Sequence, residues 1–350
     1  MTLTERADNT ITDNKVYVAY CCSDLFSEVC GVSIASLFEN NRHIDNINVY
    51  IVDDKISDKN KSYINKLAES YRRSIEFIPL PDPVEFFCDE RFTPKALGHS
   101  FARLIYGKVL PGHINRLLSL DCDTMVLGDL NELWQQDITG YAAAGVDDCM
   151  GKVALQKTQH LPPDAPHCNA GMLLFDLALW RKEDWTSKFY SYIRQLFDQG
   201  NSLGGYEEEV INKVLLKRIK ILHPRFNLMT LEQVLSYDLL LKFRQPLNYY
   251  SEEEIREAIS RPVITHTTNF FYVRRRIFEE NSDHPMRKQY EKYRALTPWR
   301  NEAPIRLKST IKQKFQKNIW HMMPKRAAVY LGAFVRNEIR PLLNKKRDDE

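Results

Sequence analysis

The chain has 350 residues, 43% of them hydrophobic and 27% charged, which is typical of a globular protein with one large domain and an appendage, or with two domains. The net charge of +3 conceals a basic tail, because residues 306–350 hold 12 Lys or Arg against 4 Asp or Glu while the remainder holds 37 against 42. No run of about 18 apolar residues could span a bilayer, and neither end has the pattern of a signal peptide, so we expect no membrane-spanning helix.

Cysteine usage indicates a reducing compartment. The seven cysteines are odd in number, lie mainly in apolar runs and lack the Cys-x-x-Cys spacing of many metal sites. We therefore expect buried thiols in a cytoplasmic protein.

Strand and helix patterns alternate through the first 80 residues. Apolar runs predict strands over 16–20, 47–52 and 75–78, and helical patterns lie between them, the second beginning at a Ser57 cap. This order predicts an α/β protein with a parallel sheet covered by helices. No Gly-x-Gly-x-x-Gly follows the first strand, which argues against a dinucleotide oxidoreductase, although a polar loop there is compatible with nucleotide binding.

The segment Asp121-Cys122-Asp123 separates two apolar runs and predicts a strand, a site and a second strand. In extended backbone residues i and i+2 point to the same side, so Asp121 and Asp123 can offer hard oxygen ligands to one divalent cation. A turn with two solvated carboxylates has the same spacing and remains an alternative. The position at the end of a buried strand favours a ligand site.

The rest of the chain continues the alternation. We expect helices over 92–110, 180–196 and from 206, a less ordered helical insertion over 231–260, and strands over 141–146, 169–176, 219–222 and 262–266, the first of which ends on Asp147. Three polar features have ordinary structural alternatives. Helical Arg103 can cover a surface, Glu207 to Glu209 can offset a helix N-terminus, and His266 at a strand end can be a satisfied polar residue.

Taken in order, these segments resemble the retaining glycosyltransferases of family 8, which include bacterial lipopolysaccharide galactosyl- and glucosyltransferases and glycogenin. The resemblance runs from about Val16 to Trp299. Its marks are the loop from Val18 to Asp24, Gly31-Val32-Ser33-Ile34, Phe101-Ala102-Arg103-Leu104, Leu120 to Thr124, Asn169 to Leu174, Trp180-Arg181, Glu207 to Asn212, Arg225-Phe226-Asn227, Ile264-Thr265-His266, and the ending with His284-Pro285 and Thr297-Pro298-Trp299.

The resemblance implies a GT-A fold, with a Rossmann-like, mostly parallel central sheet and helices on both faces. It implies a catalytic domain over 15–300, a flexible N-terminus over 1–14 and a basic helical tail over 301–350. The expected activity is retaining transfer of glucose or galactose from a UDP-hexose, with Mn²⁺ or Mg²⁺, to a bacterial cell-surface glycan or lipid-linked saccharide. Two carboxylates and an imidazole suit Mn²⁺ better than Mg²⁺.

Site residues follow from position in the family pattern. The metal ligands would be Asp121, Asp123 and His266. The donor would be held by residues of the first loop (Ala19, Cys21, Ser23, Asp24), by Cys122, Asn169 and Ala170, by Arg103 and Glu207 at the sugar, and by Arg275. Asp147 would lie on the acceptor side, and Glu207 and Glu208 would be catalytic.

Three departures from the family pattern leave alternatives open. Glu207-Glu208-Glu209 stands where Asp-Gln-Asp is usual, so Glu208 could be a covalent nucleophile, although front-face attack by the acceptor is favoured. The Pro-Trp expected after His266 is missing, and either Arg275 or Arg276 could contact the diphosphate, or the basic run could be solvated. Ser23-Asp24-Leu25-Phe26 replaces the more usual Asp-Asp-Asn-Tyr.

The tail over 306–347 alternates basic and apolar residues at helical spacing, which is typical of interfacial helices on anionic lipid. The alternative is a helical appendage packed on the catalytic domain. We expect peripheral contact with the cytoplasmic face of the inner membrane and no nucleic-acid partner. The rival functions are a sugar-1-phosphate nucleotidyltransferase, which should have a Gly-rich phosphate loop, and a non-catalytic sugar-nucleotide or membrane-binding protein.

Overall fold

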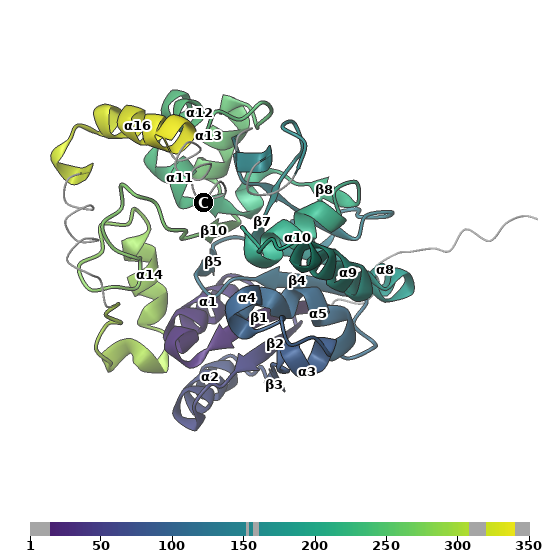
Figure 1. Cartoon of the computed structure of the whole chain (residues 1–350). Helices are drawn as coiled ribbons and strands as arrows, with labels where there is room; N and C mark the ends of the chain where they lie inside the picture. Colours follow the sequence, from purple (N-terminus) through teal and green to yellow (C-terminus); the bar gives the residue numbers. More distant parts are fainter. Residues whose placement is uncertain (1–14, 152–153, 157–160, 308–319, 340–350) are drawn as a thin grey trace, which may run out of the picture.

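The computed structural model describes residues 15–151, 154–156, 161–307 and 320–339 (Figure 1). The predicted flexible segment 1–14 and the parts 308–319 and 340–350 of the predicted basic tail lie outside these residues. A seven-stranded sheet has the order β3-β2-β1-β4-β7-β6-β8, and β7 runs antiparallel to both of its neighbours while the other pairs are parallel. The predicted mostly parallel sheet is therefore confirmed. Its strands are β1 (Lys15–Ser23), β2 (Asn46–Asp54), β3 (Ile75–Pro79), β4 (Arg116–Leu120), β6 (Ala143–Asp147), β7 (Cys168–Asp176) and β8 (Ile219–Ile221).

Helices cover both faces of this sheet, as predicted. On β1, Val18 and Tyr20 pack in one hydrophobic cluster and Ala19 packs in the other, because successive side chains point to opposite faces. The first face is covered by α1 (Ser27–Asn40), α2 (Asp58–Ser70) and α14 (Arg287–Arg294), and the second by α5 (Ala102–Val109), α8 (Leu177–Glu183), α9 (Trp185–Asp198) and α10 (Tyr206–Val214). Short helices α3 (Pro83–Phe87), α4 (Pro94–Leu97) and α6 (Asn131–Trp134) connect the strands.

A second, three-stranded sheet crosses the edge of the main one. It has the order β5-β10-β9, formed by Thr124–Val126, Ile264–His266 and Leu228–Met229. Strand β10 pairs antiparallel with β5, so that His266 lies opposite Thr124. This small sheet joins the segment after β4 to the last third of the chain.

Two predicted helices are each broken by a residue with positive φ. The helix expected over 92–110 divides at Gly98 (φ 76°) into α4, a 3-10 turn and α5, and Thr93 caps only α4. The helix expected over 180–196 divides at Asp184 (φ 48°) into α8 and α9. Left-handed residues end a helix because they turn the backbone out of the helical path.

The prediction of a less ordered insertion was wrong. Between β9 and β10 lie three defined helices, α11 (Thr230–Val234), α12 (Tyr237–Arg244) and α13 (Glu252–Ser260). The α13 N-terminus carries a full capping box between Ser251 and Glu254, a strong start signal. A third hydrophobic cluster holds α11 and α12 together.

The described part of the tail packs on this insertion. Helix α16 (Lys325–Phe334) buries Val329 and Ala333 against α12 (Figure 1). Its other side leaves Tyr330, Leu331 and Phe334 from 45% to 56% exposed. For this helix the structure therefore shows the alternative, a helical appendage packed on the rest of the chain. In the ranges that the structure describes, no helix combines the length and apolar character needed to cross a bilayer.

Candidate active site

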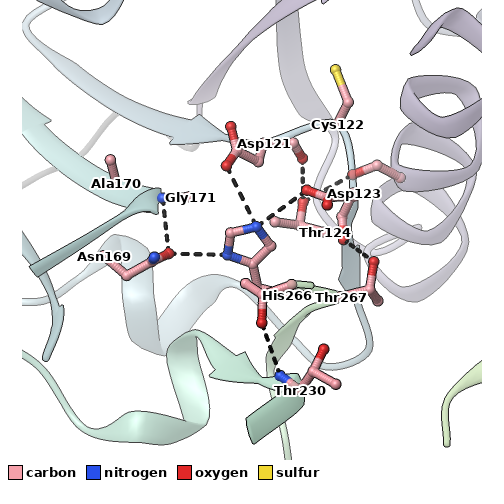
Figure 2. Close-up of polar contacts among 12 residues, drawn as sticks. Asp121, Cys122, Asp123, Thr124, Asn169, Ala170, Gly171, Thr230, His266 and Thr267 are labelled. Atoms are coloured by element: carbon pink, nitrogen blue, oxygen red, sulfur yellow. Dashed lines mark hydrogen bonds and ion pairs between the residues drawn. The ribbon is translucent and has the colours of Figure 1, made fainter. Parts of the chain in front are cut away.

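The Asp121-Cys122-Asp123 segment forms the turn between the two sheets. The Asp121 amide donates to the Gly171 carbonyl on β7 at 2.8 Å, and the Thr267 amide donates to the Asp123 carbonyl at 3.0 Å. These bonds tie the segment to both sheets and turn the two carboxylates to the same side (Figure 2). The predicted order of strand, site and strand is confirmed.

His266 completes a group of three candidate metal ligands. Its Nε2 atom lies 3.1 Å from Asp123 Oδ1 and 3.4 Å from Asp121 Oδ2. One ligand atom from each residue lies within 4.8 Å of the others. The three residues named for the metal are therefore brought together, although they are separated by up to 145 positions.

Asn169 orients the imidazole. Its Oδ1 atom lies 3.0 Å from His266 Nδ1 and accepts a bond of 3.0 Å from the Gly171 amide (Figure 2). The same oxygen accepts a bond of 3.0 Å from the Asn227 side chain. An oxygen that already accepts two hydrogen bonds selects the tautomer in which Nδ1 is the donor, which leaves Nε2 facing the carboxylates. Burial lowers the pKa of His266 and the charge of Asp123 raises it, with a net increase. The donor set of two carboxylates and one oriented imidazole fits a divalent cation such as Mn²⁺.

Gly171 makes room for that imidazole. A Cβ atom at this position would lie 2.1 Å from His266 Cε1, closer than any real contact. The strand predicted over 169–176 is found as β7 (Cys168–Asp176). The neighbour that the missing side chain accommodates is the histidine ring.

Arg103 is buried beside Asp121 and Glu207 and does not cover the protein surface. Only 1% of the residue is exposed, and its guanidinium contacts Asp121, Glu207 Oε1 at 2.7 Å and Ser119 Oγ at 3.3 Å. Burial by itself lowers the pKa of Arg103, but the charges of Asp121 and Glu207 raise it by more. The pKa is therefore raised overall, and the guanidinium stays charged. The surface alternative for Arg103 is excluded.

The three glutamates of α10 have different partners. Glu209 accepts bonds from the Gly204 and Gly205 amides at 2.7 and 3.1 Å, the stabilising role expected at a helix start. Glu207 instead pairs with Arg103, and burial raises its pKa. Glu208 accepts from the Ala170 amide at 2.9 Å and from the Asn169 side chain at 3.2 Å. Of the three, Glu209 is therefore the one that binds amides before the helix start, and it also accepts from the Tyr192 hydroxyl at 3.0 Å.

An acidic cluster surrounds Glu208. Polar atoms of Asp148, His167 and Glu208 lie within 4.8 Å of one another. Burial raises the pKa of Asp147 to about 7 and that of Glu208 to about 8. A cavity of about 170 Å³ opens beside Asp147 and is lined by residues of 150–166 and of 247–248. The sequence pointed to Asp147 here, but gave no signal for His167, which lies in an irregular loop.

Three residues expected to contact the donor have side chains engaged elsewhere. Ala19 is fully buried, and its strand is paired on both sides, so its side chain faces the core. Asp24 Oδ1 accepts from the Ser57 amide and the Asn60 side chain at 2.8 and 2.7 Å, next to the start of α2. The Cys122 side chain points away from the carboxylates (Figure 2), and its thiol donates to the Cys21 carbonyl. Cys21 and Ser23, at the carboxyl end of β1, are partly exposed.

Arg276, not Arg275, reaches the carboxylates. Its Nη1 atom lies 3.4 Å from Asp123 Oδ2. Arg275 donates to the Glu280 carbonyl at 2.5 Å on an exposed surface. The sequence gave both residues as candidates, and alternation in the basic run did not distinguish them.

Comparisons with known proteins agree with this geometry. The family model described as Glycosyl transferase family 8 matches residues 17–266. The chain is 25% identical over 288 residues to general stress protein A of Bacillus subtilis, covering 82% of this chain and 96% of that protein. It is 26% identical over 322 residues to the lipopolysaccharide 1,2-glucosyltransferase of Escherichia coli K12, covering 91% and 88%.

Solved structures show the same fold. The galactosyltransferase LgtC, in complex with donor and acceptor sugar analogs, superposes with a TM-score of 0.64 at 15% identity over 86% of this chain and 100% of that chain. The bifunctional glycosyltransferase WbbM gives a TM-score of 0.66 at 19% identity over 84% of this chain, which spans about half (52%) of WbbM. The predicted GT-A-like architecture is confirmed.

Proposed function

Because the chain belongs to glycosyltransferase family 8, we propose that it is a retaining, metal-dependent hexosyltransferase acting from UDP-glucose or UDP-galactose. The acceptor would be a bacterial cell-surface glycan or a lipid-linked saccharide. The observation that supports this most is the convergence of Asp121, Asp123 and His266 at one edge of the main sheet. The curated relative from Escherichia coli is a lipopolysaccharide 1,2-glucosyltransferase, which supports the class of acceptor.

Asp121, Asp123 and His266 would hold the divalent cation, best matched by Mn²⁺. When bound, the cation supplies Lewis-acid stabilisation to the charge that develops on a diphosphate leaving group. Arg276 lies beside Asp123 and would add a second positive charge there. Cys21 and Ser23 at the carboxyl end of β1 are the remaining candidates for contact with the nucleotide.

Arg103 would position the donor sugar indirectly. Its ion pairs with Asp121 and Glu207 connect a metal-binding carboxylate to the glutamate expected at the sugar. A buried arginine between two carboxylates holds both in fixed orientations, because separating any pair leaves a desolvated charge. Asn169 plays the same part on the other side, since it touches both His266 and Glu208.

The role of Glu208 distinguishes two mechanisms that would retain the configuration at the anomeric carbon. As a nucleophile it would form a covalent bond to the anomeric carbon while the UDP oxygen leaves, and the acceptor hydroxyl would then displace it. In front-face attack the acceptor hydroxyl enters beside the departing phosphate, whose oxygen takes the proton. Glu208 already accepts two hydrogen bonds, and burial raises its pKa to about 8, which both weaken it as a nucleophile. We favour front-face attack.

Glu208→Ala with added azide separates these routes. A covalent mechanism predicts that transfer falls by several orders of magnitude and that azide restores turnover as a glycosyl azide. Front-face attack predicts a smaller loss and no azide product. Glu209→Gln, on the same helix turn but bonded to Gly204 and Gly205, is the matched control for general damage to α10.

The acceptor would bind at the acidic cluster of Asp147, Asp148 and Glu208. The cavity beside Asp147 supports this placement, because carboxylates accept hydrogen bonds from the hydroxyls of a neutral sugar.

The exposed apolar side chains of α16, with Lys325 and Arg326 at its start, support peripheral contact with anionic lipid. Vesicle co-sedimentation of Leu331→Glu/Phe334→Glu beside the unaltered chain tests that contact. Equal sedimentation would contradict it.

The activity test is UDP release from a panel of UDP-sugars by purified protein, with and without Mn²⁺. Slow, acceptor-independent release from one donor is expected, dependent on metal and lost in Asp123→Ala. Asp129→Ala is the matched control, because Asp129 is exposed and pairs with His43 outside the site. Calorimetric titration with UDP accompanies the assay. If no donor is hydrolysed and UDP does not bind with Mn²⁺, the alternative of a non-catalytic protein replaces the proposal.

A further inference from the structure

Three cysteines meet directly behind the Asp121-Cys122-Asp123 turn. Cys22 ends β1, Cys30 lies on α1 and Cys122 lies between the two carboxylates. Their sulfur atoms all lie within 4.8 Å of one another, and each residue is at most 8% exposed. Nothing in the proposed transfer reaction uses them.

We propose that this thiol cluster (Cys22, Cys30 and Cys122) is a binding site for a three-coordinate thiophilic centre, of which trivalent arsenic is the best match. Three thiolate bonds of about 2.3 Å at the roughly 100° angles of a pyramidal arsenic centre place the sulfur atoms about 3.5 Å apart. The sulfur atoms of the cluster already lie within 4.8 Å of one another, so binding requires them to move closer together. Sulfur ligands alone select soft centres over the hard cations that suit the Asp121 side.

The net charge of the occupied cluster favours a trivalent centre over a divalent ion. The polar neighbours of the cluster include the Tyr20 hydroxyl, which bonds to Ser33 at 3.1 Å, and the Cys21 and Ser23 carbonyls, while the Asp121 carboxylate adds a negative charge near Cys122. A divalent ion held by three thiolates leaves one negative charge in this buried place, which is costly without a partner. A trivalent centre with three thiolates is neutral.

The binding step balances without an oxidant. Arsenous acid has three hydroxyl groups, and each thiol replaces one of them. Three As–S bonds form, three As–O bonds and three S–H bonds break, and three waters leave with the thiol protons. No electrons are transferred, and both reactants and the product are uncharged.

Occupation of the cluster would act on the carboxylates through the backbone. Within the turn, the Cys122 side chain points away from His266 while those of Asp121 and Asp123 point toward it (Figure 2). The Cys122 thiol now donates to the Cys21 carbonyl at 3.2 Å, a bond that an As–S bond replaces. Drawing Cys122 toward Cys30 therefore changes the spacing of the two carboxylates.

Native mass spectrometry with sodium arsenite and a phosphine reductant tests the binding itself, independently of the proposed reaction. One arsenic per chain with loss of three waters is expected, and it should disappear in Cys30→Ser, whose side chain lies outside the carboxylate turn. Cys149→Ser, also buried but elsewhere, and the exposed Cys88→Ser should keep it. No arsenic on the unaltered chain, or equal binding by Cys30→Ser, overturns the proposal.

X-ray absorption on the unaltered arsenic-loaded chain needs no variant. Three sulfur neighbours are expected, and one or two would contradict the site.

The effect of arsenic binding on the carboxylates is measured by calorimetry, as the Mn²⁺ affinity in the presence of UDP. Arsenite should lower that affinity at least tenfold in the unaltered chain and leave it unchanged in Cys30→Ser. Equal affinity with and without arsenic would show that the cluster binds but is not coupled, and would overturn the second half of the proposal.

Discussion

The Oδ1 atom of Asn169 lies 3.0 Å from Nδ1 of His266, and the same oxygen accepts from Gly171 and Asn227. Asn169 therefore acts on the proposed metal through the histidine rather than by direct ligation. Such supporting groups fix the tautomer and the ring orientation of a ligand.

Replacing Asn169 with Ala should weaken Mn²⁺ binding by about 10- to 100-fold, because the imidazole loses its acceptor and can rotate. Calorimetric titration with Mn²⁺ at saturating UDP measures the change. Asn201→Ala, on an exposed turn, should bind Mn²⁺ like the unaltered chain. If both variants bind equally, the proposed orienting role of Asn169 is wrong.

Gly171→Ala should displace the same ring by steric contact. The added Cβ would meet His266 Cε1 at 2.1 Å, so either the imidazole or β7 must shift. We expect a loss of about 1–3 kcal/mol in the free energy of unfolding, together with weakened Mn²⁺ binding. Urea unfolding and calorimetry measure the two effects. Gly112→Ala, where no atom lies within 4 Å, should change neither. Unaltered Mn²⁺ affinity in Gly171→Ala would contradict the contact.

Arg276 and Arg275 form a natural pair for testing the diphosphate contact. Arg276→Ala should lower the affinity for UDP with Mn²⁺ by roughly tenfold, the effect of one lost charge-assisted hydrogen bond. Arg275→Ala should change it by less than about twofold, since that side chain bonds to Glu280 at the surface. Fluorescence or calorimetric titration reads both. A larger loss for Arg275→Ala would reverse the assignment.

Glu208 should make stability depend on pH in metal-free protein. Burial raises its pKa from 4.5 to about 8, with Asp148, Glu207 and Asp121 adding repulsion. Between those values the native state binds a proton that the unfolded state releases, so the free energy of unfolding falls as pH rises through this window.

Glu208→Gln removes that proton uptake. Its unfolding free energy should exceed that of the unaltered chain by roughly 2–4 kcal/mol more at pH 8 than at pH 5. His167 and Asp147 titrate in both proteins, so only the difference between the two curves reports on Glu208. Urea unfolding with a chelator present gives the comparison. Parallel curves would show that Glu208 is not desolvated in solution.

The sequence predicted that Asp121 and Asp123 lie on the same side, but the reason differs from the one it suggested. The segment is a turn, in which the Thr124 amide donates to the Asp121 carbonyl at 3.2 Å, rather than extended backbone. The placement of His266 came from family resemblance alone, since the three-residue strands β5 and β10 carry too little pattern to predict their pairing. The partners of Glu207, Glu208 and Glu209 depend on how α10 packs against its neighbours. Three consecutive glutamates in the sequence do not show which of them faces which neighbour.

Other features needed the tertiary structure for a different reason. Cys22, Cys30 and Cys122 have no short spacing, so only the packing of α1 beside β1 and the carboxylate turn brings their sulfurs together. The breaks at Gly98 and Asp184 were missed because the apolar pattern continues across each of them. A left-handed residue interrupts a helix without interrupting its hydrophobic face.

The parallel pairing of β9 with β10 has a consequence for how the chain can diversify. Met229 lies opposite His266, and all three helices of the 230–260 segment leave and return between these two neighbouring strands. A crossover whose ends are fixed side by side can change in length or sequence without moving the strands that anchor it. New acceptor preferences could therefore arise by exchanging this segment, while the register of β10, and with it the position of the histidine, is inherited intact.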